Sequence, residues 1–316
     1  MHRHTIIATI SFTLLALCAA LWFMNYSGES VSSPASGTPT TARTPATNIE
    51  TLPNGKKWKA LTDDRLPLHQ RLELARSISD STDAKDASAL FALLDHTPKA
   101  GTEEDWYVVF NEIMERMRRY GIGADSFAAQ MGRLLADPTR PEIVRDYAVQ
   151  HLILWIAPGN PDQVPHEEEP EIVARNLGLI AGAVIDPTLS DTTVPGTALQ
   201  ALAEASGNLP ADVSASAWQS LDVYLNGLFS GEIPTRLSTR VSAIQAVALA
   251  GRRQYLPDIR AFAASETTDP SVRLSSIASL GTYATADDRI LLEKIAARND
   301  RYRFAASSAL ERLNAN

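Results

Sequence analysis

The chain has 316 residues, of which 45% are hydrophobic and 21% charged, and its 29 Lys and Arg against 37 Asp and Glu give a formal net charge of −8. This composition is typical of a globular protein and excludes a chain that is disordered throughout. Because a nucleic-acid-binding protein needs a basic face for the phosphates, the acidic balance argues against a nucleic-acid partner.

The N-terminus carries a long apolar segment. Residues 1–4 are a short basic start, and the residues from Thr5 to Met24 contain no charge. At about 1.5 Å per residue, about 20 helical residues span the roughly 30 Å core of a bilayer. We therefore expect residues 5–26 to form a signal anchor or transmembrane helix. Arg3 before it predicts a cytoplasmic N-terminus and a body on the extracytoplasmic, periplasmic side.

Two other fates of this segment remain open. Cleavage after the small residues Cys18-Ala19-Ala20 would release the body into the periplasm. Lipidation of Cys18 is the other fate, because the residues before it resemble a lipobox, although Leu17 stands where that family has a small residue. All three fates place the body outside the cytoplasm.

A linker follows the apolar segment. Residues 27–58 are rich in Ser, Thr, Pro and Ala and have no hydrophobic period, which predicts a disordered, flexible tether. The one cysteine of the chain lies before it, so the body can form neither a disulfide nor a thiolate metal site.

The body reads as successive helices separated by Pro, Gly and Asp. Leu66–Ser79 with Ala84–Asp95, and Glu103–Tyr120 with Asp125–Ala136, are two expected helix pairs, and 213–229 is a later second helix. Five apolar residues at helical spacing are expected to form a buried stripe: Trp106, Phe110, Ile113, Met114 and Met117. The pattern favours an all-α fold.

A recurring arginine marks the first helices. Asp269-Pro270-Ser271-Val272-Arg273 opens one helix, with Ser276, Ile277 and Leu280 behind it and Gly281 after the last apolar residue. Asp287 and Asp288 then open the second helix. Small and aliphatic residues also follow three and seven positions after Arg145, Arg240 and Arg303, and a degenerate copy begins at Pro195.

This pattern resembles the HEAT repeat, whose first helix commonly reads D-x-x-V-R-x-x-A-x-x-A-L. The resemblance implies an all-α, α-solenoid fold of roughly five to six HEAT-like helical hairpins over residues 59–316, clearest over 140–316. It also implies a structural role for Arg145, Arg240, Arg273 and Arg303, which would tie adjacent repeats together by hydrogen bonds.

In HEAT proteins the second helices line a protein-binding surface. Here those helices would contribute a mixed set of polar side chains: Gln130, Arg133, Arg175, Gln219, Asp222, Arg289 and Glu293. The resemblance therefore implies a non-enzymatic scaffold, tethered to the outer face of a membrane, with another protein of the cell envelope as its partner.

Motifs for catalysis are missing from the sequence. It has no G-x-S-x-G, S-x-x-K, H-E-x-x-H, Walker loop or G-x-G-x-x-G. His166 with Glu167, Glu168 and Glu169 is the only His–carboxylate cluster, and its Pro-rich loop favours a solvated acidic turn over a metal site. We therefore expect no catalytic residue, metal or cofactor.

Two alternatives remain. One is an enzyme or enzyme accessory of the HEAT-like bilin-lyase type, which would need a cytoplasmic location. The other is an envelope factor that handles lipid or glycan.

Overall fold

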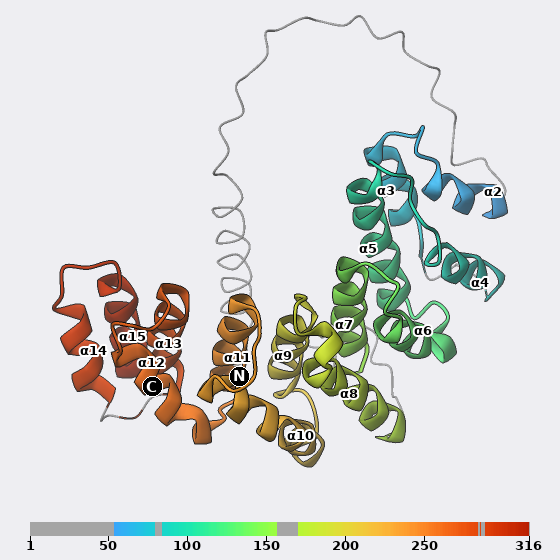
Figure 1. Ribbon diagram of the computed structural model, residues 1–316. Helices are drawn as coiled ribbons and strands as arrows, with labels where there is room; N and C mark the ends of the chain where they lie inside the picture. The colour runs from blue at the N-terminus through green and yellow to red at the C-terminus, as the bar shows by residue number, and fades with distance from the viewer. Residues whose placement is uncertain (1–53, 80–83, 157–169, 284, 286–287, 316) are drawn as a thin grey trace, which may run out of the picture. The chain divides into compact units, whose positions relative to one another are not determined.

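The computed structural model describes residues 54–79, 84–156, 170–283, 285 and 288–315. This part of the chain is all-helical, without a strand (Figure 1), which confirms the all-α prediction there. The expected anchor at 5–26 and His166 with its three glutamates lie outside the described residues. None of the described helices combines the length and the apolar character needed to cross a membrane.

The described helices follow one another with short connections. Their bounds are α2 (Asn54–Lys59), η2 (Ala60–Thr62), α3 (Leu68–Arg76), α4 (Ala84–Leu93), α5 (Glu103–Arg119), α6 (Ala124–Ala136), α7 (Glu142–Ile156), α8 (Pro170–Ile185), η3 (Pro187–Leu189), α9 (Val194–Ala205), α10 (Ala211–Ser230), α11 (Leu237–Leu249), η4 (Arg253–Tyr255), α12 (Leu256–Ala264), α13 (Pro270–Tyr283), α14 (Asp288–Ala296) and α15 (Arg303–Ala315). Residues Asn48–Asn316 form one compact unit.

From α3 onward, each odd-numbered helix packs against the next odd-numbered helix. The helices α3, α5, α7, α9, α11, α13 and α15 contact one another in that order. The closest pairs formed by neighbours in sequence are α6 with α7, α8 with α9, α12 with α13, and α14 with α15. Each close pair therefore joins the expected second helix of one repeat to the first helix of the next, one helix out of step with the sequence-based pairing.

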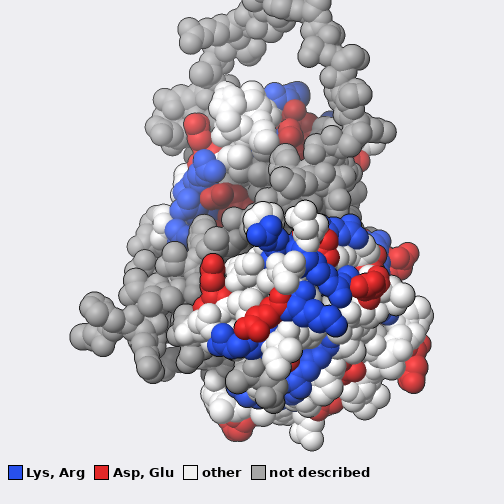
Figure 2. Space-filling model, turned by 90° about the vertical axis from the view of Figure 1, so that its left-hand side faces the viewer, with Lys and Arg blue, Asp and Glu red and all other residues white. Residues whose placement is uncertain are grey.

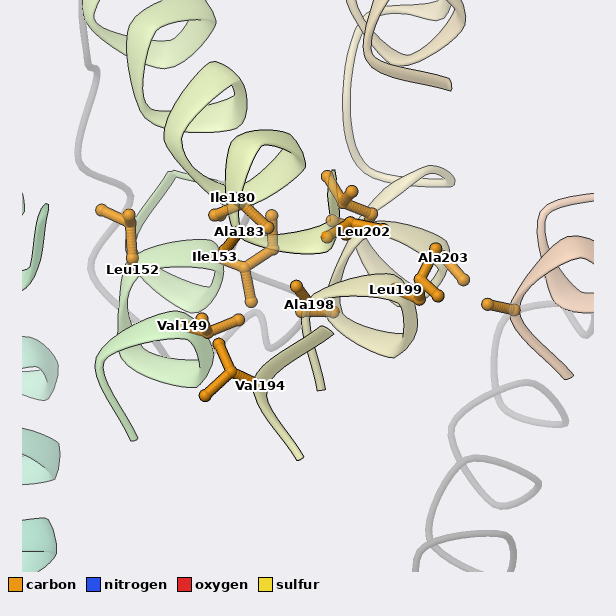
Figure 3. Packing of buried hydrophobic residues seen from close by; sticks show 14 of the residues in the cluster. Val149, Leu152, Ile153, Ile180, Ala183, Val194, Ala198, Leu199, Leu202 and Ala203 are labelled. Carbon is orange, nitrogen blue, oxygen red and sulfur yellow. The ribbon is translucent and has the colours of Figure 1, made fainter. Parts of the chain in front are cut away.

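The core is built from the apolar face of each helix. All five residues of the stripe expected on α5 are buried. Further along, Val149 and Ile153 of α7 face residues of α8 and α9 that include Ile180, Val194 and Ala198 (Figure 3). One connected cluster of buried side chains runs from Trp58 to Ala309. Because this unit contains its own core, we expect residues 48–316 to fold alone.

Two of the repeat arginines close a turn between helices. The buried Arg145 of α7 donates from Nε to the carbonyl oxygen of Leu135 at 2.8 Å. Arg273 of α13 donates in the same way to Ala263 at 3.1 Å. Both acceptors lie in the last turn of the preceding helix, where carbonyl groups lack a partner within their own helix. Each arginine therefore joins the two members of a close pair.

The other two arginines of the signature are more exposed than Arg145 and Arg273. Arg240 of α11 is half-buried, and Arg303 at the start of α15 is exposed. Next to Arg303 it is Tyr302 that points inward, and the Arg273 guanidinium lies 4.5 Å from the centre of the Tyr302 ring. The four arginines thus share a sequence pattern but not one environment.

One expected boundary needs correction. The body begins within the tether expected at 27–58, because α2 starts at Asn54 and Trp58 is buried with its indole donating to Asp86 at 2.9 Å. Gly281, which follows the last apolar residue of the signature, lies inside α13. A Cβ there would lie 2.7 Å from the Cα of Ala309, so the glycine lets α13 and α15 approach each other.

Candidate partner-binding surface

Among the expected second helices, α8 lies next to both α6 and α10. Their inner faces are buried through apolar residues at helical spacing, such as Phe127 and Met131 of α6, Ile180 of α8 and Leu221 of α10. Their outer faces carry five of the seven side chains that the sequence assigned to partner binding.

On α6 those side chains are engaged within the chain. Arg133 donates to Gln130 at 3.2 Å and to both carboxylate oxygens of Asp95 at 2.9 and 3.1 Å. Asp95 also accepts from Arg140. All of these side chains are at least partly exposed, so the pairs are weak ties rather than fixed anchors, and Arg133 remains within reach of a partner.

Arg175 and Gln219 are exposed on α8 and α10, whereas Asp222 has an internal role. Its Oδ1 accepts from the Tyr255 hydroxyl at 2.7 Å, from Gln254 at 3.2 Å and from Arg252 at 3.4 Å. Burial of the ring, and then the hydrogen bond to Asp222, raise the pKa of Tyr255 above its usual range. Asp222 therefore ties α10 to the segment before α12 and is a poor candidate for binding a partner.

The remaining two residues belong to a different part of the chain. Arg289 is half-buried and Glu293 exposed on α14, and α14 packs against α15. The expected set thus divides into a group on α6, α8 and α10 and a separate pair on α14.

Sequence reasoning missed two apolar residues on the outer faces. Leu179 of α8 is 38% exposed and Val223 of α10 is 84% exposed. Each follows an expected polar residue, Arg175 or Gln219, by one helical turn. Leu179 also covers Gly132 of α6, since a Cβ on that glycine would meet the Leu179 side chain at 2.9 Å. The available signal was an apolar residue at i+4 from each polar position.

Two glycines leave part of the outer face of α8 without side chains. Gly178 and Gly182 lie one turn apart, and a Cβ added to either meets nothing within 4 Å. Neither has a positive φ, so neither turn geometry nor internal packing requires a glycine. The Arg175 and Leu179 side chains therefore border a strip of bare backbone.

A buried histidine lies between α5 and α7. The His151 Nε2 is 2.9 Å from the Asn111 amide oxygen, and its Nδ1 is 3.9 Å from Glu115. Glu115 accepts from Arg118 at 2.6 Å and from Arg119 at 3.2 Å. Burial, and then the charge of Arg118, lower the pKa of His151 to about 3. The imidazole is therefore neutral near pH 7 and serves as part of the core.

A polar network joins three of the first helices. Arg236, before α11, donates to Glu142 of α7 at 3.1 Å and to Asp191 at 3.2 Å. Thr193, before α9, donates through its hydroxyl to Asp146. Burial raises the pKa of Asp146, against the lowering effect of the Thr193 hydrogen bond. These contacts link the N-terminal ends of the three helices. Among the described residues, no group of three His, Cys, Asp or Glu side chains is placed to hold a metal ion.

Comparisons with known proteins give little further guidance. No family model matches the chain, and no curated protein matches it. Among solved structures, human deoxyhypusine hydroxylase in complex with glycerol matches with 14% identity over 83% of this chain and 96% of that chain, at a TM-score of 0.35. This match corrects the expectation that the chain is not an enzyme, because the matched protein is itself an enzyme. At this TM-score the likeness transfers neither a detailed fold nor a reaction.

Proposed function

We propose that the chain is a HEAT-like α-solenoid that binds another protein through the outer faces of α6, α8 and α10. In this proposal residues 5–26 tether the body to the extracytoplasmic face of a membrane, and the partner is a protein of the cell envelope. The support comes from the order of helix contacts, which fits a stack of repeats whose second helices present one side to solvent.

Val223 carries the proposal. At 84% exposure it is the most exposed of the large aliphatic residues that the structure describes, and it stands one turn beyond the exposed Gln219. Protein interfaces typically combine an apolar centre with a polar rim. Leu179 and Ile185 supply further exposed apolar area on α8, and the same three helices carry the exposed polar side chains Arg133, Arg175 and Gln219.

The open glycines of α8 fit the same use. A glycine in the middle of a helix costs about 1 kcal/mol relative to alanine. Nothing inside the chain requires this cost at Gly178 or Gly182, because both Cβ positions are empty. A partner that packs against α8 gains from them, since its backbone can approach the α8 backbone more closely than alanine would allow.

The test is affinity capture of envelope proteins with immobilised residues 48–316, comparing wild type with V223D. We expect wild type to recover a defined envelope protein and V223D to lose it, because a carboxylate would have to be desolvated in the contact. The matched control is L249D, which places the same charge on an exposed leucine at the end of α11. Equal recovery by V223D, or recovery no better than by an unrelated helical-repeat protein, would rule out this surface.

A further inference from the structure

The turn between α14 and α15 is a basic segment in an acidic chain. Residues 294–304 contain Lys294, Arg298, Arg301 and Arg303 against one acid, Asp300, so this segment carries 4 − 1 = +3 within a chain of net charge −8. Figure 2 looks onto the side formed by the C-terminal helices, where many Lys and Arg side chains lie among fewer Asp and Glu side chains. We call residues 294–304 the basic turn.

Among the described residues, three of these four cations have no ion-pair partner, although the Arg301 guanidinium lies 5.1 Å from the centre of the Tyr302 ring. Arg298 is paired with Glu266 at 2.6 Å. The one acid of the turn, Asp300, accepts from the Tyr302 amide at 2.9 Å. Within the described part of the chain no carboxylate forms an ion pair with Lys294, Arg301 or Arg303. These three cations therefore face solvent as net charge.

An exposed aromatic residue lies beside these cations. Phe304, the second residue of α15, is 81% exposed. Its neighbour Tyr302 is buried against Arg273, with the guanidinium 4.5 Å from the ring centre. Tyr302 thereby anchors the basic turn to α13, and the exposed Arg303 and Phe304 follow it at the start of α15.

We propose that the basic turn binds the surface of an anionic phospholipid bilayer. Such a surface offers phosphate groups to Arg and Lys, and beneath them an apolar layer that accepts a Phe side chain without a preformed pocket. An acidic protein would match the charges, but it would need a cavity shaped for Phe304. The proposal goes beyond the protein-binding function and does not require the N-terminal segment, since the basic turn belongs to the body.

A tryptophan substitution reports insertion directly. All four tryptophans of residues 48–316 are buried, so in F304W the change on adding lipid comes from position 304. We expect the emission of F304W to shift to shorter wavelength with vesicles of phosphatidylglycerol and phosphatidylethanolamine, and to stay unchanged with phosphatidylcholine vesicles. About 0.5 M NaCl should largely reverse the shift, because it screens exposed charges.

Vesicle flotation then tests whether binding depends on the charges of the basic turn or on the charge of the whole protein. We expect R301Q/R303Q to lower the partition coefficient on anionic vesicles at least about tenfold, since each basic side chain contributes about fivefold at such a surface. F304S should also weaken it. The control R65Q/R119Q removes two charges from other exposed arginines and should bind as wild type does.

Three outcomes would overturn the proposal: equal binding to neutral vesicles, equal loss in R65Q/R119Q, or no vesicle binding by wild type. Retention on poly-glutamate beads without vesicle binding would instead assign the basic turn to an acidic protein partner. None of these outcomes bears on capture through Val223, so the two proposals fail separately.

Discussion

At the scale of single residues, the protonation state of His151 is set by its burial, which no sequence motif around it indicates. Its ring is enclosed between α5 and α7, and the nearby Arg118 guanidinium adds a like charge to any proton that it would gain. The pKa near 3 is the result. The histidine therefore stabilises the fold only while it is neutral.

This shift predicts a pH-dependent stability. The folded pKa of about 3 lies below the ordinary value of 6.5, so between these values the unfolded chain binds the proton that the folded chain excludes. Wild type should lose stability relative to H151Q as the pH falls from about 6.5, by up to about 1.4 kcal/mol per pH unit. Urea unfolding of both proteins at several pH values measures this, and parallel pH profiles would contradict the shift.

At the scale of elements, the contact between α13 and α15 depends on Gly281. The Cβ of an alanine there would meet backbone atoms of Ala309, and a backbone cannot move aside as a flexible side chain can. Overpacking of this kind typically costs 1–3 kcal/mol.

We therefore expect G281A to lower the free energy of unfolding by about 1–3 kcal/mol. The matched control is G178A on α8, where the added Cβ meets nothing within 4 Å. It should raise stability by about 0.5–1 kcal/mol through helix propensity alone. Chemical denaturation measures the free energy of unfolding of both variants. A G281A protein as stable as G178A would show that α13 and α15 accommodate the added methyl group.

Much at this scale could be predicted from the sequence. The spacing of apolar residues located α5 and α10 and identified the buried face of α5. It could not show which helices pack most closely, because that depends on contacts such as Gly281 with Ala309, which are distant in sequence. The role of Asp222 was hidden for the same reason, since its partner Tyr255 lies 33 residues further on.

The candidate surface was only partly predictable. Arg175 and Gln219 are exposed, as their helical positions suggest. Leu179 was missed because Leu177, Leu179 and Ile180 form a nearly continuous apolar run, and periodicity alone does not tell which member faces outward. Val223 was missed because a partner-binding surface was expected from polar side chains alone.

At the scale of the whole molecule, each helix gains its stability mainly from neighbours in the stack. Helix α9 packs against both α7 and α11, and α11 packs against both α9 and α13. Helix α15, in contrast, has only α13 as a neighbour in this series. Stability in such a stack is roughly a sum over neighbouring contacts, so local opening is easiest where neighbours are fewest.

Amide hydrogen exchange of residues 48–316 should therefore be graded. We expect the slowest exchange in α9 and α11 and faster exchange in α15 and in the short α2, with mass spectrometry of peptides from each helix as the measurement. One uniform exchange rate for all the helices would mean that the body opens as a single cooperative unit instead.

The bonds from Arg145 to Leu135 and from Arg273 to Ala263 have a consequence for how such a chain can grow. In both cases donor and acceptor are ten residues apart, so both ends of the bond fall within one short stretch of coding sequence. A duplication or deletion of one helix pair carries the whole bond with it and leaves no unmatched arginine behind. Repeat number can thus change during evolution without breaking this bond in the pairs that have it.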